Sequence, residues 1–264
     1  MRVSYHNHTA WSDGAASLAA MLDGARAARL DEFGLSDHYA LLPGGEPVSW
    51  AMPPDFLGAY VRALWEAAAA TDDLTVRVGI EVDYFPETEA ETLAALAAQR
   101  FDYRIGSVHF ADGFPLDAAP APWEALNEDE RDEVWRRYWT YLRRAVETRA
   151  FDIIGHLDLP KKFGFLPRAD FSGLIADLLD AIADCGPAIE LNTAGWDKPI
   201  GEQYPSLALL RAARRRGIPL VISADAHAPA QVASHFARAR DLAQAAGYTA
   251  TVRFAGRERS AVPL

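Results

Sequence analysis

Two histidines near the start of the chain, His6 and His8, are separated by a single residue in a segment that we expect to be extended. Side chains alternate in direction along an extended chain, so both imidazoles face the same side and can reach one metal ion. The residues from Ser17 onward have the composition of a capped helix start. We therefore expect the pair to lie at the C-terminal end of a strand, where an alternating β/α unit begins.

Histidines and carboxylates recur wherever a further strand is expected to end. Of the 7 histidines, only His235 falls elsewhere, in a predicted helix, where we expect a surface residue. The others are His6, His8, His38, His109, His156 and His227, and the carboxylates at the same level are Asp13, Glu81 and Asp225. The C-terminal ends of strands in a closed β/α barrel meet on one face, where active sites are built. Histidine with carboxylate, without clustered cysteine, is a ligand set for zinc, manganese or iron.

Strand-like and helical segments alternate along the chain and must position these residues. Strands are expected over 32–35, 75–80, 103–108, 151–155, 188–191, 219–223 and 249–254. Helices are expected over 54–70, 88–99, 127–148, 171–184, 206–216 and 229–246. The segment 111–122 is rich in Asp, Pro, Ala and Gly and is expected to form a loop over the site. Without an internal repeat or a clear linker, the sequence predicts one α/β domain over residues 1–264.

The composition restricts the class of partner. The formal net charge of −11 argues against a broad nucleic-acid or membrane surface. A small anionic substrate is compatible with this charge, because metal ions and local lysines reverse the field inside one pocket. The single cysteine, Cys185, allows no internal disulfide. No stretch approaches the roughly 20 apolar residues of a membrane span, and the N-terminus lacks a signal pattern, so we expect a cytoplasmic protein. The sequence does not predict an oligomeric state.

Taken in order, the motifs resemble those of the polymerase and histidinol phosphatase (PHP) superfamily. They are His6-x-His8-Thr9, Ser12-Asp13-Gly14, Ser36-Asp37-His38, Gly79-Ile80-Glu81, Ser107-Val108-His109, Gly155-His156-x-Asp158 and Ser223-Ala224-Asp225-Ala226-His227. Within the superfamily the chain most resembles the histidinol-phosphate phosphatases of histidine biosynthesis. That likeness depends on longer segments, such as Gly155-His156-Leu157-Asp158-Leu159-x-Lys161-Lys162-Phe163 and Glu190-x-Asn192-Thr193-x-Gly195.

The resemblance implies a distorted (β/α)7 TIM-like barrel that holds two or three divalent ions, zinc, manganese or iron. It assigns one ion to His6, His8, Glu81 and Asp225. It assigns a second ion to Glu81, His109 and His156, and a third to Asp13, His38 and His227. Glu81 would then bridge two ions, and its position directly at the end of a predicted strand is consistent with that role.

The charge of such a site favours a phosphate ester. Three divalent ions outweigh the three carboxylates and leave a net positive charge that attracts a phosphomonoester dianion. The implied reaction is metal-assisted hydrolysis, in which a hydroxide held between the two ions that share Glu81 attacks phosphorus in line. We expect Glu81, Asp225 and His227 to be catalytic, with Asp225 or His227 assisting proton transfer to the leaving alkoxide.

Further residues are expected to contact the substrate. Lys162 and Lys198 follow ligand-bearing strand ends and are predicted to contact phosphate, although relatives often carry an arginine next to the position of Lys198. Asn192 and Asp83 are expected to recognise the amine or imidazole of the substrate. Asp37 is expected to accept an N–H from the neighbouring imidazole of His38.

Three functions are compatible with these motifs. The first is hydrolysis of L-histidinol phosphate to L-histidinol and phosphate. The second is a related phosphoesterase activity on a nucleotide or an oligonucleotide end, against which the acidic composition argues. The third is a non-catalytic, metal-stabilised scaffold, which predicts a missing ligand, whereas every expected ligand is present.

Overall fold

The computed structural model describes residues 2–264, so Met1, the first residue of the expected domain, lies outside the described residues. Its centre is a ring of parallel strands, two of which are interrupted. The strands are β1 (Val3–Ser4), β2 (Glu32–Leu35) continued by β3 (His38–Ala40), β4 (Thr75–Val78) continued by β5 (Glu81–Asp83), β6 (Ile105–Ser107), β9 (Ile153–Ile154), β10 (Ala188–Asn192) and β11 (Leu220–Ser223). Counting each interrupted pair as one strand gives the seven strands that the resemblance implied.

The ring closes in two sheets that share the interrupted strands. One sheet has the order β1-β2-β4 and the other the order β11-β10-β9-β6-β5-β3, with all pairs parallel. Asn7 forms a parallel bridge with Ala226, and the His8 amide donates to the Ala226 carbonyl at 2.8 Å, which joins β1 to β11. The expected distorted (β/α)7 barrel is therefore confirmed.

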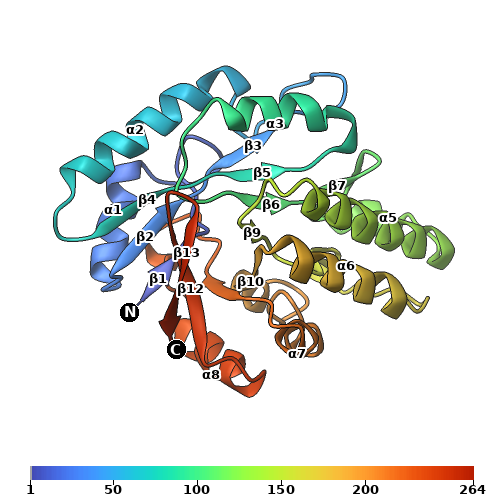
Figure 1. Ribbon diagram of the computed structural model, residues 1–264. Coiled ribbons are helices and arrows are strands. Elements are labelled where there is room, and N and C mark those ends of the chain that lie inside the picture. Colours follow the sequence, from blue (N-terminus) through green and yellow to red (C-terminus); the bar gives the residue numbers. More distant parts are fainter. Residues whose placement is uncertain (1) are drawn as a thin grey trace.

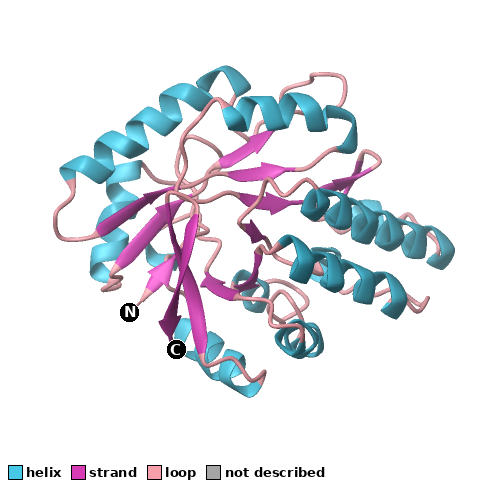
Figure 2. Ribbon diagram, in the orientation of Figure 1, coloured by secondary structure: helices cyan, strands magenta, loops and turns pink. Residues whose placement is uncertain are grey.

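Helices surround the ring of strands (Figures 1 and 2). They are α1 (Leu18–Ala27), α2 (Leu57–Ala70), α3 (Glu89–Ala97), α4 (Ala121–Glu124), α5 (Glu128–Glu147), α6 (Ser172–Cys185), α7 (Leu207–Arg215) and α8 (Phe236–Ala245). Short 3-10 turns are η1 (Pro54–Phe56), η2 (Pro86–Thr88), η3 (Leu159–Phe163), η4 (Ala194–Asp197) and η5 (Pro229–Gln231). Ser17, Asn127 and Ser206 cap the helices that follow them, because each side chain accepts a free amide of the first turn. On α5, Trp135, Trp139 and other apolar side chains form a buried stripe.

A C-terminal hairpin of β12 (Ala250–Ala255) and β13 (Glu258–Pro263) covers one end of the barrel. Phe254 packs with Tyr5 and Tyr103 in the apolar cluster inside that end, and the Phe254 amide donates to the Tyr5 hydroxyl at 3.0 Å. The Tyr103 ring fills the space beside Gly79, where a Cβ atom would come within 2.1 Å of the ring. Because this end is closed by packing, the functional residues lie at the opposite, C-terminal ends of the strands.

Two segments differ from the sequence expectations. The expected helix over 229–246 is broken, because His235 adopts a left-handed conformation with φ 59° and α8 begins only after it. The expected loop over 111–122 forms part of a small hairpin, β7 (Phe110–Ala111) with β8 (Phe114–Pro115), followed by α4. Over residues 2–264, none of the helices has both the length and the apolar character needed to cross a bilayer.

Candidate metal centre

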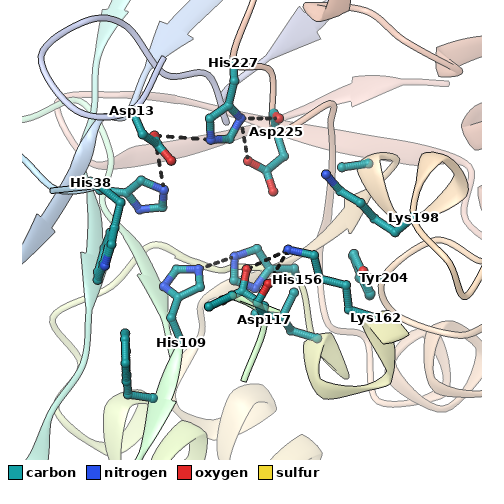
Figure 3. A pocket seen from close by; sticks show the side chains of 15 residues that line it. Asp13, His38, His109, Asp117, His156, Lys162, Lys198, Tyr204, Asp225 and His227 are labelled. Carbon is teal, nitrogen blue, oxygen red and sulfur yellow. Dashed lines mark hydrogen bonds and ion pairs between the residues drawn. The ribbon is translucent and has the colours of Figure 1, made fainter. Parts of the chain in front are cut away.

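The nine residues predicted as metal ligands converge at the C-terminal end of the barrel. His6 and His8 follow β1, His38 begins β3 and Glu81 begins β5. The others are His109 after β6, His156 after β9, Asp225 and His227 after β11, and Asp13 in the turn before α1. Figure 3 shows six of them around one cavity, with their side chains directed toward one another.

Glu81 is the centre of this cluster and is fully buried. Its Oε2 atom lies 2.9 Å from Nε2 of His6 and 2.8 Å from Nδ1 of His38. Its Oε1 atom lies 3.1 Å from Nε2 of His156 and 3.8 Å from Nε2 of His109. The two carboxylate oxygens therefore face two different groups of imidazoles, as a bridging ligand requires.

Two further carboxylates complete the cluster. Asp225 Oδ1 lies 3.2 Å from Nε2 of His8. Asp13 Oδ1 lies 3.3 Å from Nε2 of His227 and 3.8 Å from Nε2 of His38. Asp225 adopts a left-handed backbone conformation with φ 53°, which is uncommon outside glycine.

These side chains fit divalent cations. Nε2 of His6, both ring nitrogens of His8, Nδ1 of His38 and Oε2 of Glu81 are buried without a hydrogen-bond partner among residues 2–264. Two ligands of a tetrahedral zinc ion lie about 3.4 Å apart when each is about 2.05 Å from the ion. The distances around Glu81, between 2.8 and 3.8 Å, bracket this value. A cation placed among them would satisfy polar atoms that are otherwise left unpaired.

The cluster divides into overlapping groups rather than isolated ones. Ligand atoms that all lie within 4.8 Å of one another come from His6, His8 and Glu81, from His6, His156 and Asp225, from His38, Glu81 and His109, and from His8, Asp13, His38 and His227. His6, His8, His38 and Glu81 each belong to more than one group. The geometry accommodates several cations but does not separate the residues into three exclusive sets.

The electrostatics favour the ionic forms that metal ligands need. Burial opposes ionisation of Glu81, but His6 and His38 outweigh it and hold the pKa of this carboxyl well below its usual range. Burial likewise opposes ionisation of Asp225, and again nearby histidines, His6 foremost, bring its pKa well below the usual value. Burial lowers the pKa of His8 to about 3, so its imidazole is neutral. Ionised carboxylates and a neutral imidazole are the species that bind metals.

At the rim of the cluster the imidazoles respond to negative charge. Burial would lower the pKa of His109, but Asp83 raises it to about 10. In the same way, Asp13 and Asp225 outweigh burial and raise the pKa of His227 to about 9. The carboxylates next to these histidines thus favour positive charge at the rim of the cluster.

Buried acidic residues orient the predicted ligands from behind, and sequence reasoning did not assign this role. Glu190 is fully buried, with Oε1 2.8 Å from Nδ1 of His6, and its Oε2 accepts the His156 amide at 2.9 Å. Asp83 accepts the His109 amide at 2.9 Å and lies 3.5 Å from Nδ1 of that ring. The Glu190 contact at Nδ1 of His6 fixes the tautomer of that ring and leaves its Nε2 free for a metal. The only sequence feature that could have indicated this role is the presence of an acidic residue within an otherwise apolar strand.

Asn192, expected to contact substrate, lies beneath the cluster instead. Its side chain is fully buried, and Nδ2 donates to Oε2 of Glu190 at 3.0 Å and to Oδ2 of Asp225 at 3.1 Å. Its Oδ1 accepts the Ala194 amide at 2.9 Å. With its amide group engaged on every side, Asn192 holds Asp225 in place and is not part of the cavity wall.

The expected contact between Asp37 and the His38 imidazole is wrong. The His38 ring nitrogens face Glu81 and Asp13. Asp37 lies in the break between β2 and β3, and its carboxylate accepts the Thr9 amide at 2.7 Å and the Ser12 hydroxyl at 2.8 Å. It therefore fixes the turn after His8.

A cavity of about 350 Å³ opens above the cluster. Lys162 and Lys198 line it together on the side opposite His38 (Figure 3). Asp117, from the segment after β8, also lines the cavity, and Nζ of Lys162 donates to its Oδ2 at 3.0 Å. Lys161 is different, because it is buried and pairs with Asp158 outside the cavity wall.

Known proteins resemble this chain over most of its length. A family model described as the PHP domain matches residues 4–194. A probable histidinol-phosphatase of Deinococcus radiodurans is 38% identical over 224 residues, which are 83% of each chain. The histidinol-phosphatase of Lactococcus lactis is 24% identical over 97% of this chain and 95% of that protein.

Solved structures agree on the fold. The crystal structure of the Lactococcus lactis histidinol phosphate phosphatase, complexed with zinc, L-histidinol and phosphate, has a TM-score of 0.81 at 21% identity and covers 98% of both chains. A putative histidinol phosphatase of Listeria monocytogenes has a TM-score of 0.76 at 20% identity, over 90% of this chain and 99% of that one. The family model, the 38% identical relative and the barrel together show that this chain belongs to the PHP family.

Proposed function

We propose that this protein is a histidinol-phosphatase, which hydrolyses L-histidinol phosphate to L-histidinol and phosphate in histidine biosynthesis. The observation that carries the proposal is the complete histidine and carboxylate cluster, which opens into one cavity lined by two lysines. A volume of about 350 Å³ suits a small phosphomonoester. The relatives from Deinococcus radiodurans and Lactococcus lactis, named for this activity, support the same substrate.

The cofactors of the proposed reaction are two or three divalent ions, zinc, manganese or iron, held by the nine predicted ligands. The zinc in the Lactococcus lactis structure supports zinc as one of them. Bound there, the ions would polarise the phosphoryl oxygens and lower the pKa of a bound water to about 7. The chain's own contribution is to fix the ligands, which Glu190, Asp83 and Asn192 do from behind.

Three ligands also take part in the chemistry. Glu81 presents its two oxygens to two groups of imidazoles and would be held in common by the ions that those groups bind. Asp225 and His227 lie at the cavity wall, where one of them would assist proton transfer to the leaving alkoxide. The His227 ring is held between Asp13 Oδ1, 3.3 Å from its Nε2, and the Asp225 carbonyl, 3.0 Å from its Nδ1.

The cavity wall matches the two charges of the substrate. Lys162 and Lys198 supply cations for the phosphate group. Asp117 is the cavity carboxylate outside the predicted ligand set, and it accepts the substrate's ammonium group. In L-histidinol phosphate these two charges are only two carbon atoms apart, and the adjacent Lys162 and Asp117 side chains, 3.0 Å from each other, reproduce that pairing with opposite sign.

A substrate panel tests the proposal. We expect L-histidinol phosphate to be hydrolysed with a kcat/KM well above that of nucleoside monophosphates and of a single-stranded oligonucleotide. Exhaustive chelation should abolish turnover, and added zinc or manganese should restore it. A preference for a nucleotide would refute the assigned substrate, and hydrolysis by folded, metal-free protein would refute the metal dependence.

A further inference from the structure

Lys198 presents a free ammonium group to the cavity. Its side chain makes no hydrogen bond or ion pair with any residue of the described chain 2–264, and it points into the cavity (Figure 3). It directly follows η4, and its amide donates to the Gly195 carbonyl at 3.2 Å. A flexible lysine gains directional contact with a ligand only if the backbone that carries it is fixed.

Residues 193–197, which include η4, are fastened to residues 234–238 at the start of α8 by four contacts, one of which is the edge-on packing of the Trp196 ring against His235. Nε2 of His235 lies 2.9 Å from Oδ2 of Asp197, the residue next to Lys198. The guanidinium of Arg238 lies 4.2 Å from the ring centre of Trp196. Below them, the Thr193 hydroxyl donates to the Ser234 carbonyl at 2.8 Å.

The backbone of His235 is specialised for this contact. Its left-handed conformation, φ 59°, interrupts the helix expected over 229–246 and places the ring beside Asp197 and Trp196. The side chains of His235 and Asp197 are 35% and 63% exposed, and ion pairs this exposed add little to the stability of a fold. Overall stability therefore does not account for the arrangement.

We propose that His235 and Asp197, assisted by the stack of Arg238 on Trp196, are positioning residues that fix Lys198 for contact with the substrate phosphate. This inference rests on the proposed function, because it takes the phosphate contact of Lys198 from there. It also gives a role to the one histidine outside the metal cluster. None of these four residues is among those that line the cavity; they act through the backbone of η4.

A double-mutant cycle on phosphate binding tests the inference. The variants are His235→Ala, Lys198→Ala and the double variant, each measured for kcat, for KM and for the inhibition constant of inorganic phosphate. We expect His235→Ala to raise KM and the phosphate inhibition constant about three- to tenfold, with a smaller change in kcat. In the Lys198→Ala background the same substitution should have no further effect, because its consequence passes through Lys198. His235→Gln, which keeps a donor at the Nε2 position, should restore most of the loss.

A matched control separates positioning from general destabilisation. Asp180 pairs with Arg216 at 2.6 Å, is 64% exposed and lies on α6, so Asp180→Ala removes an exposed ion pair of similar kind and should leave the phosphate constants unchanged. Hydrolysis of L-histidinol phosphate by the unmodified protein tests the proposed function separately. Where that activity is present, an unchanged phosphate constant in His235→Ala overturns the positioning role. Full additivity with Lys198→Ala overturns it as well.

Discussion

Replacing Glu190 with glutamine removes one charge behind the metal cluster while keeping the size of the side chain. In the wild-type structure both oxygens of Glu190 accept hydrogen bonds, Oε1 near Nδ1 of His6 and Oε2 from the His156 amide and from Nδ2 of Asn192. A glutamine has only one oxygen. In either orientation, its NH2 group therefore faces a donor.

Each orientation harms the cluster. With NH2 toward His6, Nδ1 must accept, the proton moves to Nε2, and the nitrogen that faces Glu81 at 2.9 Å can no longer bind a metal. With NH2 toward His156, two buried donors lose their acceptor. Loss of such an orienting contact weakens metal binding about 10- to 100-fold, which corresponds to about 1.4–2.7 kcal/mol.

The assay is titration of zinc into metal-free protein in competition with a chelator, together with kcat of the reloaded enzyme. Glu32→Gln is the matched control, because Glu32 is also fully buried but pairs with Arg77 and Tyr5 at the opposite end of the barrel. It should lower stability and leave zinc affinity unchanged. If Glu190→Gln binds zinc within twofold of the wild-type protein, the orienting role is refuted.

Other substitutions probe the site and the core. Glu81→Ala removes the carboxylate that faces both imidazole groups, so metal content measured by elemental analysis should fall. The kcat should drop by more than about a hundredfold, which is the largest loss expected for a residue that only orients a ligand. Retained turnover would exclude the bridging role. Asp117→Asn should raise the KM for L-histidinol phosphate about tenfold but leave the KM for p-nitrophenyl phosphate, which has no ammonium group, unchanged. Asp112→Asn, outside the cavity, should change neither KM. Equal changes for both esters would disprove recognition of the amine by Asp117. Gly79→Ala places a Cβ 2.1 Å from the Tyr103 ring and should lower the free energy of unfolding, measured by urea titration, by at least about 3 kcal/mol. A variant as stable as the wild-type protein would show that the ring can move aside.

The barrel and its ligand-bearing end could be predicted from sequence because both follow from local periodicity. His6 and His8 share a side of an extended segment, and the other predicted ligands follow apolar runs that form strands. In a parallel barrel the C-terminal ends of all strands lie on the same face, so residues at those positions come together. Trp135, Trp139 and Leu142 recur at helical spacing, which predicts a buried stripe on the helix expected over 127–148, and all three are buried on α5.

Adjacency in sequence did not predict side-chain contacts or secondary structure where the chain turns. Asp37 adjoins His38 but lies in a strand break, and its carboxylate reaches Thr9 instead. The second strand of the C-terminal hairpin, β13, was missed because all of its residues except Val262 are exposed, and only its pairing with β12 defines it. His235 was expected on a helix, but its left-handed conformation turns it toward Asp197.

Long-range contacts decided the rest. Glu190 is 184 residues from His6 in the chain, and a single glutamate in an apolar strand has no local signal for the imidazole that it will hold. Asp117 likewise becomes a cavity residue only because Lys162, 45 residues away, is folded against it. Sequence alone determined which residue types stand at the ends of strands, since period and composition act within a few residues. The tertiary structure alone decided which of them orient one another and which line the cavity, because those relations depend on distances between strands that the chain visits far apart in sequence.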